Sequence, residues 1–184
     1  MAGQQALSRE IRARACAALF DAPVLDNTVR GLWAEIMVWL LLGREAWKYT
    51  GRNWLGHDLQ HRGTGVRVEV KQSARRQPWS TACPSPLRFD IAPRTGHYAD
   101  DGITWIAKPG RAADIYIFAL HEGWLPAEAV DHRNPAQWRF LVLPASALPE
   151  SQKTITASSL QALDACSADM HTLAATVERL LPRQ

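Results

Sequence analysis

The stretch Val66-Arg67-Val68-Glu69-Val70-Lys71-Gln72-Ser73 alternates apolar and polar side chains along its first six residues. Such alternation is typical of a β-strand with one buried face, because successive side chains of a strand point to opposite sides. The three valines are expected in the core. The polar side chains, Glu69 and Lys71 among them, then share the other face, so the strand presents a carboxylate and an ammonium group side by side.

The residues just before this strand predict that it is the second strand of a hairpin. Residues 62–65 contain two glycines, which turns favour. If the chain turns on Gly63 and Thr64, the ladder sets Asp58 directly opposite Glu69. Directly paired residues of antiparallel strands point to the same face, with Cβ atoms about 4.5 to 5.5 Å apart. The sequence therefore predicts two neighbouring carboxylates.

Two carboxylates this close repel each other unless a proton or a cation separates them. All-oxygen ligands favour a hard divalent ion such as Mg²⁺, for which Mn²⁺ is expected to substitute. We therefore expect Asp58 and Glu69 to hold Mg²⁺, with the backbone carbonyl of Val70 as a neutral ligand. Lys71 extends from the same face and could hold the attacking water or neutralise charge on a scissile phosphate.

A third acid precedes the hairpin. The pattern predicts a helix over 28–47 that is apolar on every side between Ile36 and Leu42, as in a helix buried against a sheet. Glu35 is the one acid in the first half of this helix. It either complements the helix dipole in solvent or reaches the metal, and its apolar neighbours favour the second explanation.

The segment Arg30-Gly31-Leu32-Trp33-Ala34-Glu35, followed by Asp58 and then by Glu69-Val70-Lys71, resembles the PD-(D/E)xK phosphodiesterase superfamily. This group includes restriction endonucleases and archaeal-type Holliday junction resolvases. In it a helix supplies a first acid, and a hairpin supplies an Asp followed by Glu-x-Lys. The family's Pro before the Asp is absent, because His57 occupies that place; many members lack it as well. The catalytic residues carried over are Glu35, Asp58, Glu69 and Lys71.

The resemblance implies a metal-dependent endonuclease that hydrolyses DNA phosphodiester bonds, in restriction, repair, recombination or defence against mobile elements. It also implies an α/β fold with a restriction-endonuclease-like core, in which helices flank both faces of a mixed sheet. Cutting both strands requires two sites, so a homodimer is expected, and a partner protein could supply specificity. The alternatives are a catalytically inactive DNA-binding or assembly module with the same fold, and a structural α/β protein with an accidental motif.

The rest of the pattern predicts one domain over residues 1–184, with its core at about 28–145. Further helices are expected at 4–20 and at about 158–181. Further strands are expected at 87–91, 114–121 and 138–143. Helices, a hairpin, more strands and a closing helix, in this order, are typical of a mixed sheet with helices packed on its faces.

Side chains that follow the motif are candidate DNA contacts. Arg75 and Arg76 could line a phosphate track, with a solvated loop face as an equal alternative. Gln72 and Ser73 could orient water or phosphate, although Ser73 could instead cap a helix. Trp79 is expected to stack on bases.

Most of the eight tryptophans are expected to fill the core or its rim. Trp105, like Trp79, is instead a candidate for stacking on bases. Those assigned to the core or rim are Trp33, Trp39, Trp47, Trp54, Trp124 and Trp138.

Composition sets the broad class. With 47% hydrophobic and 21% charged residues the chain matches an ordinary globular protein, and its longest apolar stretch, 36–42, is far too short to span a membrane. A net charge of +3 permits an acidic polymer as partner without requiring one. The three cysteines are widely separated, which argues against a disulfide framework and favours a cytoplasmic location.

Overall fold

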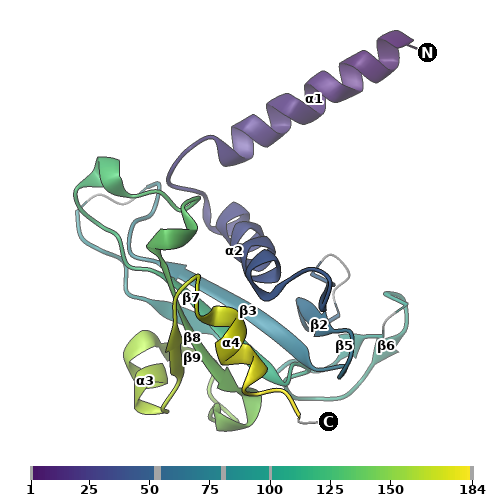
Figure 1. Ribbon diagram of the computed structural model, residues 1–184, viewed down its shortest axis with the longest axis vertical. Coiled ribbons are helices and arrows are strands. Elements are labelled where there is room, and N and C mark those ends of the chain that lie inside the picture. The colour runs from purple at the N-terminus through teal and green to yellow at the C-terminus, as the bar shows by residue number, and fades with distance from the viewer. Residues whose placement is uncertain (1, 52–54, 80–81, 100, 183–184) are drawn as a thin grey trace.

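The computed structural model describes residues 2–51, 55–79, 82–99 and 101–182 and is built around a six-stranded mixed sheet (Figure 1). The strands lie in the order β1, β2, β3, β7, β8 and β10. β3 and β7 are parallel, and the other neighbours are antiparallel. In the same order, the strands are Trp47–Tyr49, Leu59–His61, Arg67–Ala74, Ile115–His121, Trp138–Pro144 and Cys166–Ala168.

Helices cover both faces of the sheet. α2 (Asn27–Leu42) and α4 (Leu173–Glu178) pack their apolar side chains on one face. On the other face lie α3 (Ala157–Ala162) and a small two-stranded sheet of β4 (Arg88–Asp90) and β9 (Thr154–Thr156). The predicted α/β class, with helices on both faces of a mixed sheet, is therefore confirmed.

The remaining elements are short. β5 (His97–Tyr98) and β6 (Trp105–Ile106) form a hairpin at the end of the molecule near β2 (Figure 1). The sequence pattern missed these strands and also β1, β9 and β10, because two or three residues are too few to show a period. Three 3-10 turns, η1 to η3, are Ala127–Ala129, Pro135–Gln137 and Ala145–Ala147.

β3 shows the predicted alternation. Val68 and Val70 are buried in the core that includes α2, whereas Glu69 and Lys71 are partly buried on the opposite face. Every residue of the neighbouring strand β7 is buried. β3 therefore lies inside the sheet, and its polar side chains project from a rigid support.

The hairpin before β3 has the predicted register. Leu59 pairs with Val68, which is the register that sets Asp58 opposite Glu69. Asp58 immediately precedes Leu59, the first residue of β2, and its N–H donates to the Val68 carbonyl (2.8 Å). The structure therefore places its carboxylate at the start of β2, beside the middle of β3.

The loop of this hairpin is wider than predicted. The N–H of His61 donates to the Val66 carbonyl (2.8 Å) and the N–H of Gly65 donates to the His61 carbonyl (2.9 Å), so the loop comprises 62–65 rather than a turn at 63–64. Gly65 adopts a φ of 74°, which a residue without a Cβ tolerates. The register is unchanged because both loops have the same centre.

The second helix is shorter than the prediction of 28–47. α2 ends at Leu42, and Gly43, with a φ of 93°, donates its N–H to the carbonyls of Trp39 and Leu40. Glycine adopts this conformation at little cost and so ends the helix, after which the chain forms the edge strand β1. The side chain of Leu40 is exposed, so the expected burial on every side is also wrong.

The predicted closing helix over about 158–181 is instead two short helices with β10 between them. α3 is followed by Asp164, which has a φ of 57°, and the chain then pairs with β8 at the sheet edge. Leu160 of α3 packs in the core on one face, whereas Leu173 and Val177 of α4 pack in the core on the other. One straight helix cannot cover both faces, so the segment breaks where it crosses the edge.

The tryptophans divide largely as predicted. Trp47 and Trp138 are buried, and Trp79 and Trp105 are exposed. Trp54 lies outside the described residues. The partly buried ones are Trp33, Trp39 and Trp124.

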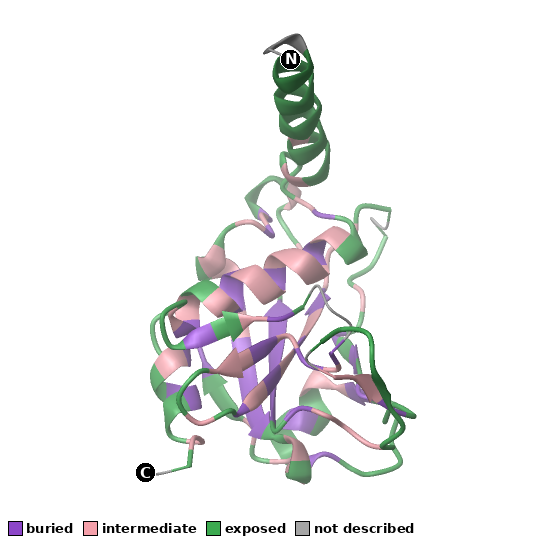
Figure 2. Cartoon of the chain, turned by 90° about the vertical axis from the view of Figure 1, so that its right-hand side faces the viewer, coloured by how far each residue is buried: buried purple, intermediate pink, exposed green. Residues whose placement is uncertain are grey.

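α1 (Ala2–Phe20) confirms the predicted first helix and projects away from the rest of the chain (Figures 1 and 2). Its apolar side chains Leu7, Ile11 and Leu19 are exposed. Within the described residues, no helix is both long enough and apolar enough to cross a membrane.

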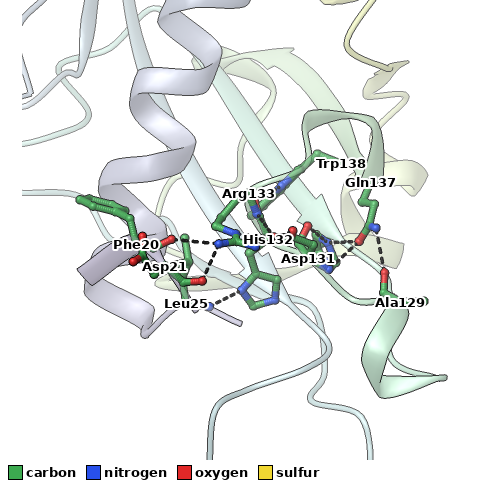
Figure 3. Close-up of polar contacts among 10 residues, drawn as sticks. Phe20, Asp21, Leu25, Ala129, Asp131, His132, Arg133, Gln137 and Trp138 are labelled. Carbon is green, nitrogen blue, oxygen red and sulfur yellow. Dashed lines mark hydrogen bonds and ion pairs between the residues drawn. The ribbon is translucent and has the colours of Figure 1, made fainter. Parts of the chain in front are cut away.

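His132, one of two buried histidines in contact, anchors the segment between α1 and α2 (Figure 3). The His132 ring accepts a hydrogen bond from the Leu25 N–H (3.1 Å), and its backbone N–H donates to the Pro23 carbonyl (2.7 Å). The His121 ring centre is 4.6 Å from that of His132, and the ring bonds to the Gln137 side chain (3.0 Å). Both histidines are 0% exposed.

Acid is expected to destabilise the fold through this pair. Burial, followed by the His121 and Arg30 charges, lowers the pKa of His132 from 6.5 to about 3. The unfolded chain therefore binds a proton below about pH 6.5 that the folded chain does not. Above that pH, the neutral His132 makes its full contribution to the free energy of unfolding. As the pH drops towards the folded pKa, this contribution falls by up to about 1.4 kcal/mol per pH unit.

Urea unfolding of the native chain and of His132→Asn, from about pH 7 to about pH 4, measures this contribution. The asparagine oxygen can still accept from the Leu25 N–H. The variant should show the flatter pH dependence. Equal slopes for the two chains would show that His132 remains able to bind a proton in the fold.

Candidate active site

Two charged side chains of β3 form the middle of the site. Glu69 and Lys71 stand two residues apart on the same face, and Lys71 Nζ lies 2.5 Å from Glu69 Oε1. Their side chains are 15% and 21% exposed, so little water screens the pair. The alternation of β3 thus fixes an ion pair in a sheltered position.

Asp58 reaches this pair from the start of β2. Its N–H donates to the Val68 carbonyl (2.8 Å), and its Oδ2 accepts the N–H of Val70 (2.8 Å). The N–H and C=O of one strand residue point to the same side. The Val70 carbonyl therefore points towards the edge of β3 at which the Asp58 carboxylate lies.

Glu35 reaches the site from α2 and is oriented by β1. Its Oε2 accepts a hydrogen bond from the Tyr49 hydroxyl (2.8 Å). Gly51 leaves room for this contact, because a Cβ there would lie 2.6 Å from the same carboxylate oxygen. The helix, the edge strand and the glycine two residues after the strand thus hold one carboxylate in place.

The carboxylates act on one another electrostatically. Burial, followed by the charges of Glu69 and Glu35, raises the pKa of Asp58 well above its usual value. Burial also raises the pKa of Glu35, while the Tyr49 hydrogen bond opposes this and the Glu69 charge adds to it. Burial lowers the pKa of Lys71, but its contacts with Glu69 and the charge of Asp58 outweigh burial and leave the pKa raised. Lys71 is therefore a cation at neutral pH.

This donor set suits a divalent cation. With all three carboxylates ionised, the cluster and its ammonium group would carry a formal charge of −2, and the oxygens are the ligands that Mg²⁺ prefers. In the described part of the chain, no group of three or more His, Cys, Asp or Glu side chains is arranged to hold a metal. Mg²⁺ does not require such a group, because it binds through one or two carboxylates and keeps several waters.

Two clefts meet at Lys71. The hairpin cleft, of about 530 Å³, runs from Asp58 and Glu69 to the β5–β6 hairpin. The helix cleft, of about 580 Å³, runs from Glu35 along the first half of α2. Both clefts are lined by Gly51, Lys71 and Asp90. Lys71 is therefore accessible from both clefts.

Two of the predicted DNA contacts are occupied within the fold. The Gln72 amide accepts from Arg30 Nε (2.6 Å) and donates to Asn27 Oδ1 (3.1 Å), which ties β3 to the start of α2. Ser73 is buried, and its hydroxyl accepts the N–H of Arg88 (3.2 Å) rather than capping a helix. Gln72 still lines the helix cleft.

The other predicted contacts lie beyond the end of β3. Arg75 is partly buried, and Arg76 lies 5.4 Å from the centre of the Trp124 ring. Trp79 is 68% exposed and is not among the residues that line the two clefts. The structure thus brings the four predicted catalytic residues together, whereas Arg75, Arg76 and Trp79 lie elsewhere.

Sequence reasoning missed two residues that position the site. Tyr49 was hidden because the pattern extends the helix to 47, which leaves no strand to carry it. Arg30 is 1% exposed and donates to Leu25, Asn27, Gln72 and Gln77. The sequence signalled Arg30 only as a charged residue among the apolar positions of α2. Its partners Gln72 and Gln77 are 42 and 47 residues away, and a single sequence does not reveal such contacts.

Comparisons with known proteins add little to this geometry. No protein-family model matches the chain. No curated protein matches it either. Among solved structures, a bacterial homing endonuclease matches with a TM-score of 0.40 and 16% sequence identity, over 71% of this chain and 76% of that one. A likeness this slight does not bear on the chemistry, which rests on the side chains described above.

Proposed function

We propose that this protein is a Mg²⁺-dependent endonuclease that hydrolyses DNA phosphodiester bonds, as its resemblance to the PD-(D/E)xK nucleases implies. The observation that carries the proposal is the sheltered cluster of Glu35, Asp58 and Glu69 around the ammonium group of Lys71, where two clefts meet. Such a cluster is unfavourable by itself and is relieved by a cation. Mn²⁺ is expected to replace Mg²⁺.

Each side chain has a role in this reaction. Asp58, Glu69 and the Val70 carbonyl would hold the ion, and Glu35 would complete or tune the site. The bound ion would supply a water of lowered pKa and stabilise the leaving oxygen. Lys71 positions the attacking water and neutralises charge on the phosphate. Tyr49 is a positioning residue that acts through Glu35.

Cleavage assays test the proposal on plasmid, linear duplex, single-stranded and branched DNA, with and without Mg²⁺ or Mn²⁺. The native chain should cut at least one of these only when the metal is present. Glu69→Gln should abolish cutting, whereas Glu45→Gln, at a carboxylate 98% exposed to solvent, should not. Metal-independent cutting, or full activity of Glu69→Gln, would refute the mechanism.

We further propose that the active species is a homodimer in which α1 of each copy covers the other. The apolar stripe of α1, a 19-residue helix, is exposed, although helices in proteins owe most of their stability to the packing of such a stripe. Next to its base is an entirely apolar groove of about 330 Å³. A two-fold pair can cover both surfaces at once. The groove is lined by Phe20, Trp33, Ile36, Met37, Leu40, Leu41 and Pro135.

Light scattering is expected to give twice the chain mass for the native protein. Leu7→Glu combined with Ile11→Glu should give monomers, because both changes place charge in the apolar stripe. Ala13→Glu, on the opposite side of α1, is the matched control and should remain dimeric. A native monomer, or a dimer that tolerates both stripe changes, would contradict this arrangement.

A further inference from the structure

The two clefts differ in chemistry, and the difference bears on which DNA they fit. The hairpin cleft is lined by Trp105 and Tyr98 and by Arg94. The aromatic residues of the helix cleft, Tyr49 and Phe89, are partly buried and buried, and its exposed arginine is Arg88. The two arginines come from one segment, and each lines one of the two clefts that share Lys71.

Trp105 is held on the rim of the hairpin cleft. Its ring centre is 5.2 Å from that of Tyr98, in an edge contact, and the residue is 50% exposed. Gly96 lies beneath it: a Cβ there would come within 2.6 Å of the Trp105 ring and 2.3 Å of the Ile106 carbonyl. Because Gly96 has no side chain, strand β6 can pack closely against it, and a large part of the Trp105 residue stays exposed.

An uncovered indole beside a catalytic cluster is a platform for a base. Base stacking on aromatic side chains is sequence-tolerant and worth about 1–3 kcal/mol per base. In an intact duplex both faces of a base are covered by its neighbours, so a base must leave the stack to use such a platform. Arginines placed along the same path neutralise the phosphates of the strand.

We infer that a single DNA strand runs through the joined clefts, with one base stacked on Trp105 and its phosphates passing Arg94 and Arg88 on either side of Lys71. The substrate class is DNA with a single-stranded segment, such as a flap, an overhang or a branch, in preference to an intact duplex. Only the statement that this strand is cut rests on the proposed nuclease function. The strand path itself is a claim about binding.

Binding without metal tests this path. Fluorescence anisotropy in EDTA compares a labelled single strand with the blunt duplex of the same sequence and with a duplex that carries an overhang. The single strand and the overhang should bind more tightly than the blunt duplex. Trp105→Ala should weaken single-strand binding by about tenfold, and Trp105→Phe should restore most of it, because phenylalanine also stacks.

Trp79→Ala is the matched control, because Trp79 is also an exposed tryptophan but lines neither of these clefts. It should leave single-strand binding unchanged, and thermal unfolding should show that every variant folds. Equal affinity for single strand and blunt duplex would overturn the inference, as would a loss confined to Trp79→Ala. A chain that binds as expected but cuts nothing with Mg²⁺ would refute the nuclease and leave the strand path standing.

Discussion

Replacing Lys71 by Met is expected to slow Mg²⁺-dependent cleavage by about a thousandfold while leaving DNA binding nearly unchanged. Removing one preorganised charge from a transition state costs about 10² to 10³ in rate. Methionine keeps the length and apolar stem of lysine but cannot neutralise the phosphate. Because the ammonium group acts mainly in the transition state, the single-turnover rate should fall and the Kd for DNA should stay nearly unchanged.

Lys48→Met is the matched control for this change. Lys48 is exposed on the edge strand β1 and does not line the described clefts. Its loss should leave the rate within about twofold of the native value, which is the ordinary behaviour of a surface side chain. If Lys71→Met kept the rate within the same range, the ammonium group would have no part in the chemistry.

Replacing Asp58 by Asn is expected to abolish activity and yet stabilise the metal-free protein. The change removes one charge from a cluster in which burial and the Glu69 and Glu35 charges disfavour the ionised form. The asparagine oxygen can still accept the N–H of Val70, so the hydrogen bond at the start of β2 is kept. The free energy of unfolding should therefore rise at neutral pH.

With Mg²⁺ bound, the native chain should become more stable than Asp58→Asn. A ligand that binds only the folded state stabilises it by about 2.7 kcal/mol at a hundred times its Kd, which corresponds to a rise in Tm of about 5 to 10 °C for a chain of this size. The native chain and Glu45→Gln should show this rise, and Asp58→Asn should lose most of it. A metal-free Asp58→Asn that is less stable than the native chain would show that the carboxylates are not in conflict.

The central part of the site could be predicted because it depends on short-range rules. The period of two in β3 assigns Glu69 and Lys71 to one face, and the loop at 62–65 keeps Asp58 in register even though it is wider than the predicted turn. Both features are encoded within about fifteen residues, where alternation and turn chemistry determine structure. The same rules do not reach Tyr49, whose strand is only three residues long.

The errors arise where the two faces of the sheet matter. Leu160 and Leu173 fit one helical pattern, but they pack on opposite faces, and periodicity alone does not say which face an element covers. The wrong prediction for Leu40 has a similar cause, because an apolar run predicts burial whether or not a neighbouring element covers it. Arg30 and the β5–β6 hairpin depend on contacts between distant segments, which a single sequence does not contain.

The most direct test of the site is calorimetric titration of Mn²⁺ into the native chain, Asp58→Asn and Glu45→Gln. If Asp58 and Glu69 hold the ion, the native chain and Glu45→Gln should bind it with the same affinity and heat, and Asp58→Asn should bind at least tenfold more weakly, since one of two carboxylate ligands is gone. Equal binding by all three proteins would contradict the metal site on which the proposed nuclease depends.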